Sequence, residues 1–346
     1  MKVLAIGDQH FHINNSIEVD EFTTNVFNHL QTTKYDAVIL LGDLLHTHEK
    51  LHTIAFNKAC QFIDRLRKIT LTIVLVGNHD MVSCSQFMTD EHWLNPLKKW
   101  DNVVIVDKAI PIDINGCRIV CCPFVPNGRF VEALNTITDY DWKQTSCIFA
   151  HQEFYGCKMG ALISTTGDHW DLSYPQIISG HIHQKQRPQQ NIYYTGSSIQ
   201  IAFGESKDNT IASIEIINEY VNISEVDLDL TRKKIEYVSM DNIDDYKVSD
   251  KKDIIKLTIT GDVDECKAFK KTTKYKELLM QENVKIVFKP KKHEQIQHNY
   301  KVKSFHDVLY TLVCKESNET LYKLYEKILN NRDVKGDVLF INCKEV

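Results

Sequence analysis

The sequence lacks the features that mark membrane, secreted and repetitive proteins. No apolar run approaches the ~20 residues needed to span a bilayer, and no signal-peptide pattern opens the chain. The ten cysteines include no C-x-x-C pair, which argues against a structural zinc site, and a disulfide framework is not expected at 346 residues. Internal repeats and low-complexity tracts are also missing. These absences predict a protein without membrane contact, located in the cytoplasm, whose cysteines are reduced.

The composition is that of an ordinary globular protein, with 43% hydrophobic and 25% charged residues. The chain is long enough for a sizeable core and for two domains. Its net charge of −5 is unevenly spread, because residues 231–346 carry +5 and residues 1–230 carry −10. The basic part indicates either contact with a polyanion or a lysine-rich solvated surface, and both interpretations stay open.

Five apolar segments end abruptly in acid, amide or imidazole side chains. Short runs rich in β-branched residues predict buried parallel strands, and the carboxyl ends of such strands are where α/β sheets build their sites. The segments and the groups that follow them are 2–6 before Gly7-Asp8-Gln9-His10, 35–41 before Gly42-Asp43, 71–76 before Gly77-Asn78-His79-Asp80, 147–150 before His151-Gln152, and 176–179 before Gly180-His181-Ile182-His183.

The rest of the pattern predicts an α/β fold. Helical periodicity over 17–30 and 54–68 gives β-α-β-α-β, with parallel strands. Helices are also predicted over 86–100 and 131–137. Asn115-Gly116 predicts a tight hairpin, after which we expect antiparallel pairing. The polar segment 229–251 predicts a domain boundary. The expected domains are an α/β domain at 1–230 that carries the polar strand ends, a smaller α+β capping domain at 231–300 and a helical region at 301–346.

Seven of the polar residues have the chemistry of ligands for a pair of divalent cations. Two cations about 3.5–4 Å apart can hold both the attacking and the leaving oxygen of a phosphoryl displacement. Mixed imidazole and oxygen ligands suit manganese, iron or zinc better than magnesium. The seven candidates are Asp8, His10, Asp43, Asn78, His151, His181 and His183.

This set of motifs resembles the calcineurin-like metallophosphoesterase superfamily, whose fold is a two-sheet sandwich flanked by helices. The resemblance implies one metal on Asp8, His10 and His183, a second metal on Asn78, His151 and His181, and a bridging Asp43. It also implies that His79 contacts the scissile phosphate as an electrostatic stabiliser or proton donor. Water made acidic by the cations would be the nucleophile. Asp80 is expected to brace the turn that carries Asn78 rather than to bind metal.

The flanking residues distinguish the branches of the superfamily. Protein serine/threonine phosphatases carry arginines where this chain has Leu44-Leu45-His46 and Leu75-Val76, so that branch is not expected. Gly42-Asp43-Leu-Leu-His46, His151-Gln152 and Gly196-Ser197 with Phe203-Gly204-Glu205 resemble the nuclease subunit of the double-strand-break repair complex, the SbcD type. By this resemblance His46 would contact the DNA backbone and assist catalysis, and Ser197 would contact substrate.

The sequence therefore predicts a DNA phosphodiesterase that uses two Mn²⁺ ions, with Fe²⁺, Zn²⁺ or Mg²⁺ as alternatives. By the resemblance it would act as a 3′→5′ exonuclease and structure-dependent endonuclease in DNA repair and recombination. The expected partners are DNA, an ABC-type coiled-coil ATPase docked on the C-terminal helices, and a second copy of the chain. If the protein is viral, it would act in the host cytoplasm or nucleoid. The alternatives are a cyclic-nucleotide or other small-molecule phosphodiesterase and a non-catalytic scaffold.

Overall fold

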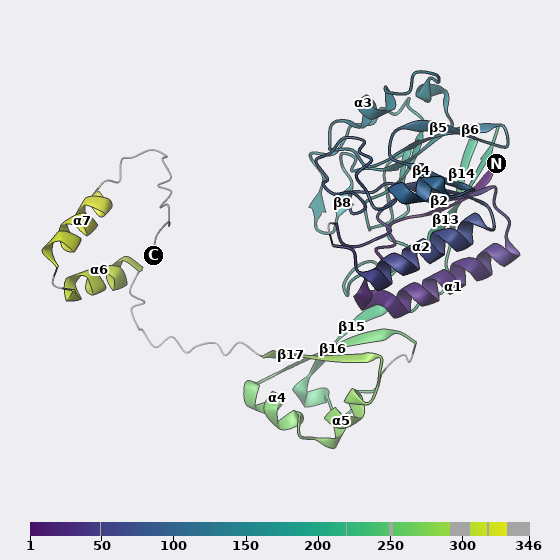
Figure 1. Ribbon diagram of the computed structural model, residues 1–346. Helices are drawn as coiled ribbons and strands as arrows, with labels where there is room; N and C mark the ends of the chain where they lie inside the picture. Colours follow the sequence, from purple (N-terminus) through teal and green to yellow (C-terminus); the bar gives the residue numbers. More distant parts are fainter. Residues whose placement is uncertain (49, 219, 249–251, 291–304, 317, 331–346) are drawn as a thin grey trace. The chain divides into compact units, whose positions relative to one another are not determined.

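Two six-stranded sheets packed face to face carry the five strands that were predicted to end in polar groups (Figure 1). This structure is a computed structural model, and it describes residues 1–48, 50–218, 220–248, 252–290, 305–316 and 318–330. The chain divides into two units, Met1–Lys291 and Lys292–Val346, and each is described by itself. Within these ranges no helix combines the length and the apolar character needed to cross a bilayer.

The first sheet has the order β14-β13-β1-β2-β3-β4, and its strands β1 to β4 are parallel. Its side chains alternate between two environments, as the period of a strand requires. Leu4 and Ile6 pack against the helices, whereas Val3 and Ala5 pack against the second sheet. The strands are β1 Lys2–Ile6, β2 Ala37–Leu40, β3 Leu71–Leu75, β4 Val103–Val106, β13 Ile211–Ile217 and β14 Tyr220–Val226.

The second sheet has the order β11-β12-β10-β7-β6-β5. Its strands are β5 Ile110–Ile114, β6 Cys117–Cys122, β7 Cys147–His151, β10 Gln176–Gly180, β11 Gln186–Gln189 and β12 Ile192–Tyr194. The hairpin at Asn115-Gly116 is confirmed, and antiparallel pairing follows it at β11–β12 and β13–β14. The expected antiparallel pairing is wrong for β6, β7, β10 and β12, which run parallel to one another.

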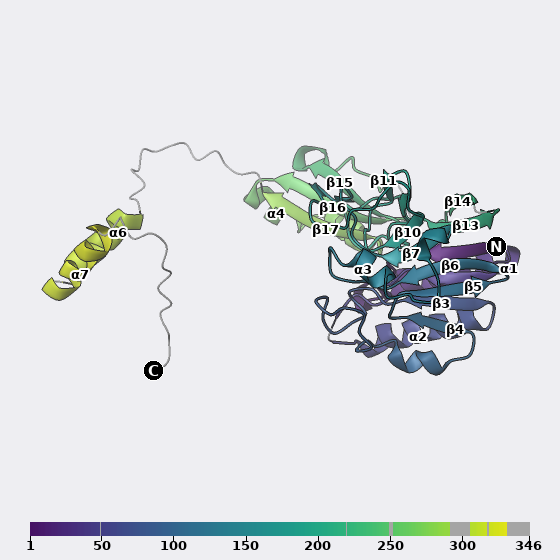
Figure 2. The same cartoon turned by 90° about the horizontal axis from the view of Figure 1, so that it is seen from above.

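Helices cover the outer faces of this sandwich, which confirms the predicted α/β fold. The helices α1 Ser16–Thr32 and α2 Thr53–Arg67 pack on the first sheet (Figure 2), and the short α3 Phe130–Leu134 packs on the second. A two-stranded hairpin, β8 Lys158–Met159 with β9 Leu162–Ile163, lies between β7 and β10 in the sequence. The layers leave the carboxyl ends of β1, β2, β3, β7 and β10 free to carry the polar groups.

The helix predicted over residues 86–100 is wrong. The structure has only a 3-10 helix there, Asn95–Lys99, with turns before it. The apolar residues of this segment anchor irregular backbone instead. Leu94 and Leu97 are buried in the core, and the Trp93 indole donates a hydrogen bond to Asp80 Oδ1 over 2.8 Å.

A third sheet follows the sandwich. Its strands β15 Lys233–Ser239, β16 Ile254–Gly261 and β17 Val284–Pro290 are all parallel, and α4 Val263–Phe269 and α5 Thr273–Leu279 pack on one face. We call β15–β17 with α4 and α5 the cap. Strand β15 lies in the segment that was predicted as a boundary, so that segment is partly an ordered strand. The domain limits at 230 and 300 stay predictions.

The C-terminal unit contributes two described helices, α6 Phe305–Lys315 and α7 Glu319–Asn330. They contact each other, and the ring of Tyr310 lies 6.0 Å from that of Tyr325. Leu312 and Leu324 are each more than half exposed. This hairpin therefore keeps apolar side chains on its surface.

Candidate metal centre

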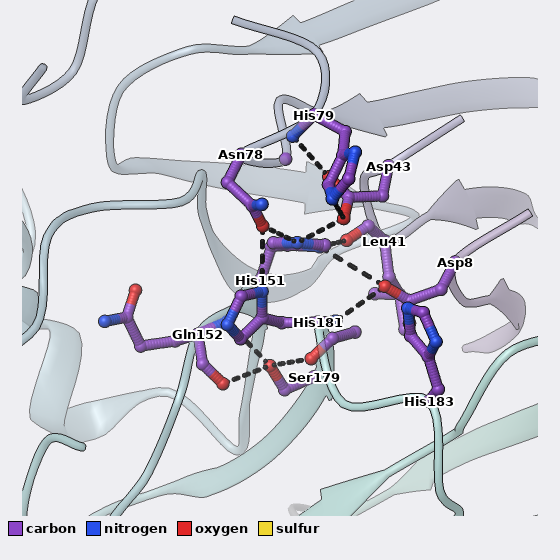
Figure 3. A network of polar contacts seen from close by, with 12 residues as sticks. Asp8, Leu41, Asp43, Asn78, His79, His151, Gln152, Ser179, His181 and His183 are labelled. Atoms are coloured by element: carbon purple, nitrogen blue, oxygen red, sulfur yellow. Dashed lines mark hydrogen bonds and ion pairs between the residues drawn. The ribbon is translucent and has the colours of Figure 1, made fainter. Parts of the chain in front are cut away.

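The seven predicted ligands lie together at one edge of the sandwich, and Figure 3 labels all of them except His10. Three sets of acid and imidazole groups have ligand atoms within 4.8 Å of one another, and the sets share members. They are Asp8, His10 and His183; His10, Asp43 and His79; and Asp43, His151 and His181. Side chains from five strand ends of two sheets therefore form one continuous cluster.

The first half of the cluster surrounds His151. Its Nε2 lies 3.0 Å from Asn78 Oδ1 and 3.4 Å from Asp43 Oδ2. Its Nδ1 donates a hydrogen bond to the Leu41 carbonyl over 2.6 Å, which fixes the ring and directs Nε2 toward Asn78. Asn78 Oδ1 also lies 2.8 Å from His181 Nδ1. The Asn78 oxygen, the Asp43 carboxylate and two imidazoles thus face one point.

The second half joins Asp8, His10 and His183. The Nε2 atoms of His10 and His183 lie 2.9 Å apart, and His10 Nε2 is 3.7 Å from Asp43 Oδ2. Asp8 Oδ1 accepts a hydrogen bond from the His181 amide, whereas its Oδ2 is buried and has no hydrogen-bond partner among the described residues. Asp43 therefore lies between the two halves, as a bridging ligand would.

The backbone at these positions is strained. The φ angles of Asp8, His10, Asp43 and His181 are 43°, 46°, 52° and 79°. Residues other than glycine rarely adopt positive φ angles. Such residues cost about 1–3 kcal/mol each and cluster at functional sites. The fold thus holds four of the seven predicted ligands in unfavourable conformations, which supports a functional role for this edge.

Asp80 ties two of the loops that carry predicted ligands together. Its Oδ2 accepts hydrogen bonds from the amides of Asp43 (2.8 Å) and Gly77 (3.0 Å), and its Oδ1 accepts one from the Trp93 indole. Gly77 is required where these loops meet, because a Cβ there would collide with the carboxylate and backbone nitrogen of Asp43. The Asp80 carboxylate is therefore fully used in positioning and does not face the cluster.

Burial and neighbouring charge shift the pKa values of the cluster in opposite directions. Burial raises the pKa of Asp8 to about 6. Burial also acts to raise the pKa of Asp43, but His151, His10 and His79 outweigh it and hold that pKa below its ordinary range. For His151, burial is outweighed by Asp43 and Asp8, which raise the pKa to about 9. Burial lowers the pKa of His181 to about 4 and keeps its ring neutral.

These groups fit a pair of divalent cations. Asp8, His10 and His183 would hold one ion, Asn78, His151 and His181 the other, and Asp43 both. The buried, unpartnered Asp8 Oδ2 and the opposed nitrogens of His10 and His183 are donors that a cation would satisfy. The raised pKa of His151 means that a proton and a cation compete for its Nε2. Nitrogen and oxygen donors together suit transition metals.

His79 and His46 flank the cluster on its open side. The His79 amide donates to Asp43 Oδ1, and its ring Nδ1 lies 2.6 Å from the His46 carbonyl, to which it donates. His79 Nε2 then points toward the cluster, 4.0 Å from Asp43 Oδ2. Because Nδ1 keeps its proton for the carbonyl, His79 can donate from Nε2 only as a cation. The His46 ring stacks near that of His79, with centroids 5.9 Å apart.

Ser197 lies outside the open part of the site. It is 2% exposed, and its amide donates to the His183 carbonyl, so it supports the turn that carries His183. This burial disfavours the predicted contact with substrate.

Glu205 was missed as a supporting residue, although it belongs to the Phe203-Gly204-Glu205 motif. Its Oε1 lies 3.7 Å from His183 Nδ1 and helps raise the pKa of that imidazole against the effect of burial. Carboxylates in this position orient ligating histidines and make them more basic. Only its place in the resemblance motif could have pointed to it from the sequence.

The comparisons with known proteins agree with this geometry. The family model of the calcineurin-like phosphoesterases matches residues 1–185. This chain belongs to that family. It is 48% identical over 275 residues to "Putative phosphoesterase 244L" of Invertebrate iridescent virus 6, which covers 78% of this chain and 97% of the relative. It is 42% identical over 302 residues to "Putative phosphoesterase 078R" of Invertebrate iridescent virus 3, covering 86% of each chain.

A more distant relative is exonuclease subunit 1 of Enterobacteria phage T4. It is 24% identical over 222 residues, which cover 60% of this chain and 62% of the relative. Membership of the phosphoesterase family explains why acid, amide and imidazole groups gather at one edge of the sandwich. The protein is a metal-dependent phosphoesterase, and its substrate has to be inferred from the surroundings of the cluster.

Proposed function

We propose that this phosphoesterase is a two-metal DNA phosphodiesterase that uses Mn²⁺, with Fe²⁺, Zn²⁺ or Mg²⁺ as alternatives. The observation that carries the proposal is the convergence of Asp8, Asp43, Asn78 and His151 with their neighbours on one point. Bound divalent cations supply Lewis-acid activation of water and neutralise phosphate charge. The distant likeness to a phage exonuclease subunit and the basic charge of residues 231–346 favour DNA as the substrate.

The chain's own groups divide the work of the reaction. Asp43 and the other predicted ligands would hold the cations, and the Leu41 carbonyl and Glu205 orient two of these histidines, His151 and His183. His79 presents its Nε2 to the site and, when protonated, stabilises the developing negative charge or donates a proton to the leaving oxygen. His46 holds the His79 ring through its carbonyl, and its own ring faces the open side where a DNA backbone would lie.

We further propose that the protein acts in DNA repair or recombination, as a 3′→5′ exonuclease and structure-dependent endonuclease. An ABC-type coiled-coil ATPase would dock on the C-terminal helices, and the viral relatives favour a role in the host cytoplasm. The exposed Leu312 and Leu324 of the C-terminal hairpin support a docking role. Co-purification of this chain with a coiled-coil ATPase encoded nearby tests the partnership, and stimulation of cleavage by ATP tests its purpose.

The substrate class is tested by assaying linear double-stranded and single-stranded DNA beside cyclic AMP and bis(4-nitrophenyl) phosphate, with Mn²⁺. We expect cleavage of DNA and of the small diester. Hydrolysis of cyclic AMP without cleavage of DNA would establish the small-molecule alternative. Absence of bound metal together with absence of any hydrolysis would establish the scaffold.

The role of His79 is tested by His79→Ala. We expect hydrolysis of DNA to fall by about 10²–10³-fold, while both cations stay bound in a metal analysis. Asp43→Asn, the comparison variant, should lose metal and hydrolysis together. His29→Ala controls for the loss of an imidazole far from the site, since His29 pairs with Tyr35. Loss of metal from His79→Ala would make His79 a ligand and contradict the assignment.

A further inference from the structure

A loop after the last ligand pair brings an aromatic ring beside the metal centre. Phe203, Gly204 and Glu205 line a cavity of about 940 Å³ together with His181 and His183. The β8–β9 hairpin forms the opposite wall, with Met159 among its residues. This volume lies in the range of ligand-binding pockets. Phe203 therefore lines the same cavity as two predicted metal ligands.

The cap contributes two lysines to the same ring. In register across the third sheet, Ile235 of β15 pairs with Lys256 of β16, which pairs with Lys285 of β17. Their neighbours in each strand face the helices of the cap, so these three residues occupy the face that carries no helix. The Nζ atoms of Lys256 and Lys285 each lie 5.9 Å from the centre of the Phe203 ring.

The two lysines keep their charge available. Among the residues that the structure describes, no carboxylate lies within ion-pair distance of Lys256 or Lys285, whereas Lys185 and Lys233 are paired with glutamates. The next pairs along the same face, Thr258 with Val287 and Thr260 with Lys289, add no acid. This face of the cap is thus basic and lies beside an aromatic ring at the edge of the metal centre.

We propose that Phe203, Lys256 and Lys285 form a stacking platform for an unpaired nucleotide next to the scissile phosphate. A base offers a π face to Phe203 and its phosphates offer charge to the lysines, the combination that proteins use to hold single strands. The inference rests on the proposed DNA phosphodiesterase activity and deepens it, because a base inside a duplex has both faces covered by its stacked neighbours. The strand would pass from the metal centre over Phe203 to the open face of the cap.

Stacking is tested directly by photocrosslinking. Wild-type protein in EDTA, and separately in Ca²⁺, is irradiated with a single-stranded oligonucleotide that contains 5-iodouracil, and crosslinked peptides are identified by mass spectrometry. We expect a crosslink at Phe203 that weakens with salt and is lost in Phe203→Leu and in Lys256→Ala/Lys285→Ala. A duplex with 5-iodouracil at its centre should crosslink far less. Equal crosslinking of the duplex, or a crosslink confined to other segments, would overturn the proposal.

The contribution to cleavage is tested by the ratio of single-stranded DNA cleavage to bis(4-nitrophenyl) phosphate hydrolysis. Loss of one stacked base is worth about 1–3 kcal/mol, which is about 5- to 150-fold in affinity. We expect Phe203→Leu and Lys256→Ala/Lys285→Ala to lower this ratio about tenfold, through KM for DNA rather than kcat. Phe203→Trp should keep the ratio. Lys270→Ala is the matched control, since Lys270 lies over Phe288 on the helical side of the cap, and should leave it unchanged.

The outcomes separate this inference from the proposed function. If the wild-type protein cleaves DNA and Phe203→Leu keeps the ratio, the platform is wrong and the DNA phosphodiesterase stands. If the wild-type protein hydrolyses only the small diester, the proposed function itself falls. A lower melting temperature of Phe203→Leu with an unchanged ratio would assign Phe203 to holding the cap and would also overturn the platform.

Discussion

The metal centre and the helix-free face of the cap differ in charge, in burial and in the way their side chains are held. The centre is acidic and buried, and its groups are held by hydrogen bonds to backbone, as Asp80 and the Leu41 carbonyl illustrate. The cap face is basic, and Lys256 and Lys285 have no acidic partner among the described residues. The sandwich thus fixes the geometry that the reaction needs. The lysines of the cap can adapt to a long anionic substrate and select it.

The largest effect is expected from Asp80→Ala, which removes the brace of the rigid region. The change leaves the amides of Asp43 and Gly77 and the Trp93 indole without an acceptor, and unsatisfied buried donors are costly. We expect the free energy of unfolding to fall by about 4 kcal/mol, measured by urea unfolding in EDTA. Asp80→Asn, which keeps one acceptor oxygen, should lose less. Equal stability of wild type and Asp80→Ala would show that the region does not depend on this brace.

The contact that joins the cap to the sandwich is tested by Lys233→Ala. The Lys233 ammonium donates to the carbonyls of Gln200 and Ile201 and lies 3.3 Å from Glu18 of α1. Its removal leaves a largely buried carboxylate unpaired, so we expect a loss of about 3 kcal/mol in the free energy of unfolding. Lys267→Ala breaks the exposed pair with Asp264 and should cost less than about 0.5 kcal/mol. Similar losses of stability in both variants would mean that Lys233 does not hold the cap on the sandwich.

A smaller effect is expected from Glu205→Gln, which alters the support of one ligand. The glutamine can still accept the amides of Ile201 and Ala202, but it no longer places a negative charge beside His183. We expect the affinity for one of the two cations to fall about 10–100-fold, measured by metal titration. Glu225→Gln, which alters the partner of Lys185 instead, should leave both affinities unchanged. Equal weakening of both cations would contradict the assignment of His183 to one of them.

The parallel strands and the polar groups that follow them could be predicted from local sequence patterns, whereas the two-sheet sandwich was expected from the resemblance to the phosphoesterase superfamily. An apolar strand followed by Gly42-Asp43 or by Gly77-Asn78 carries its own signal, and parallel strands bring such ends to one edge. The segment 86–100 was misassigned because the spacing of Trp93, Leu94 and Leu97 reflects anchoring to Asp80 and the core, which periodicity cannot distinguish from a helix.

The supporting contacts could not be predicted, because they join residues far apart in the chain. Nothing local in Lys233 indicates that it reaches Glu18, and nothing in Lys256 or Lys285 indicates that they lie over Phe203. The sequence suggested only that residues 231–346 are basic. Strand β4 was missed because its four residues, Val103–Val106, are too short for a reliable pattern.

The left-handed backbone conformations of four predicted ligands make the stability of the fold depend on bound cations. These residues are Asp8, His10, Asp43 and His181. These conformations destabilise the native state whether or not catalysis takes place. A ligand that binds only the native state stabilises that state by about 2.7 kcal/mol when its concentration is one hundred times its dissociation constant. Depletion of divalent cations should therefore lower the amount of folded protein, through unfolding and proteolysis. It should also abolish the activity.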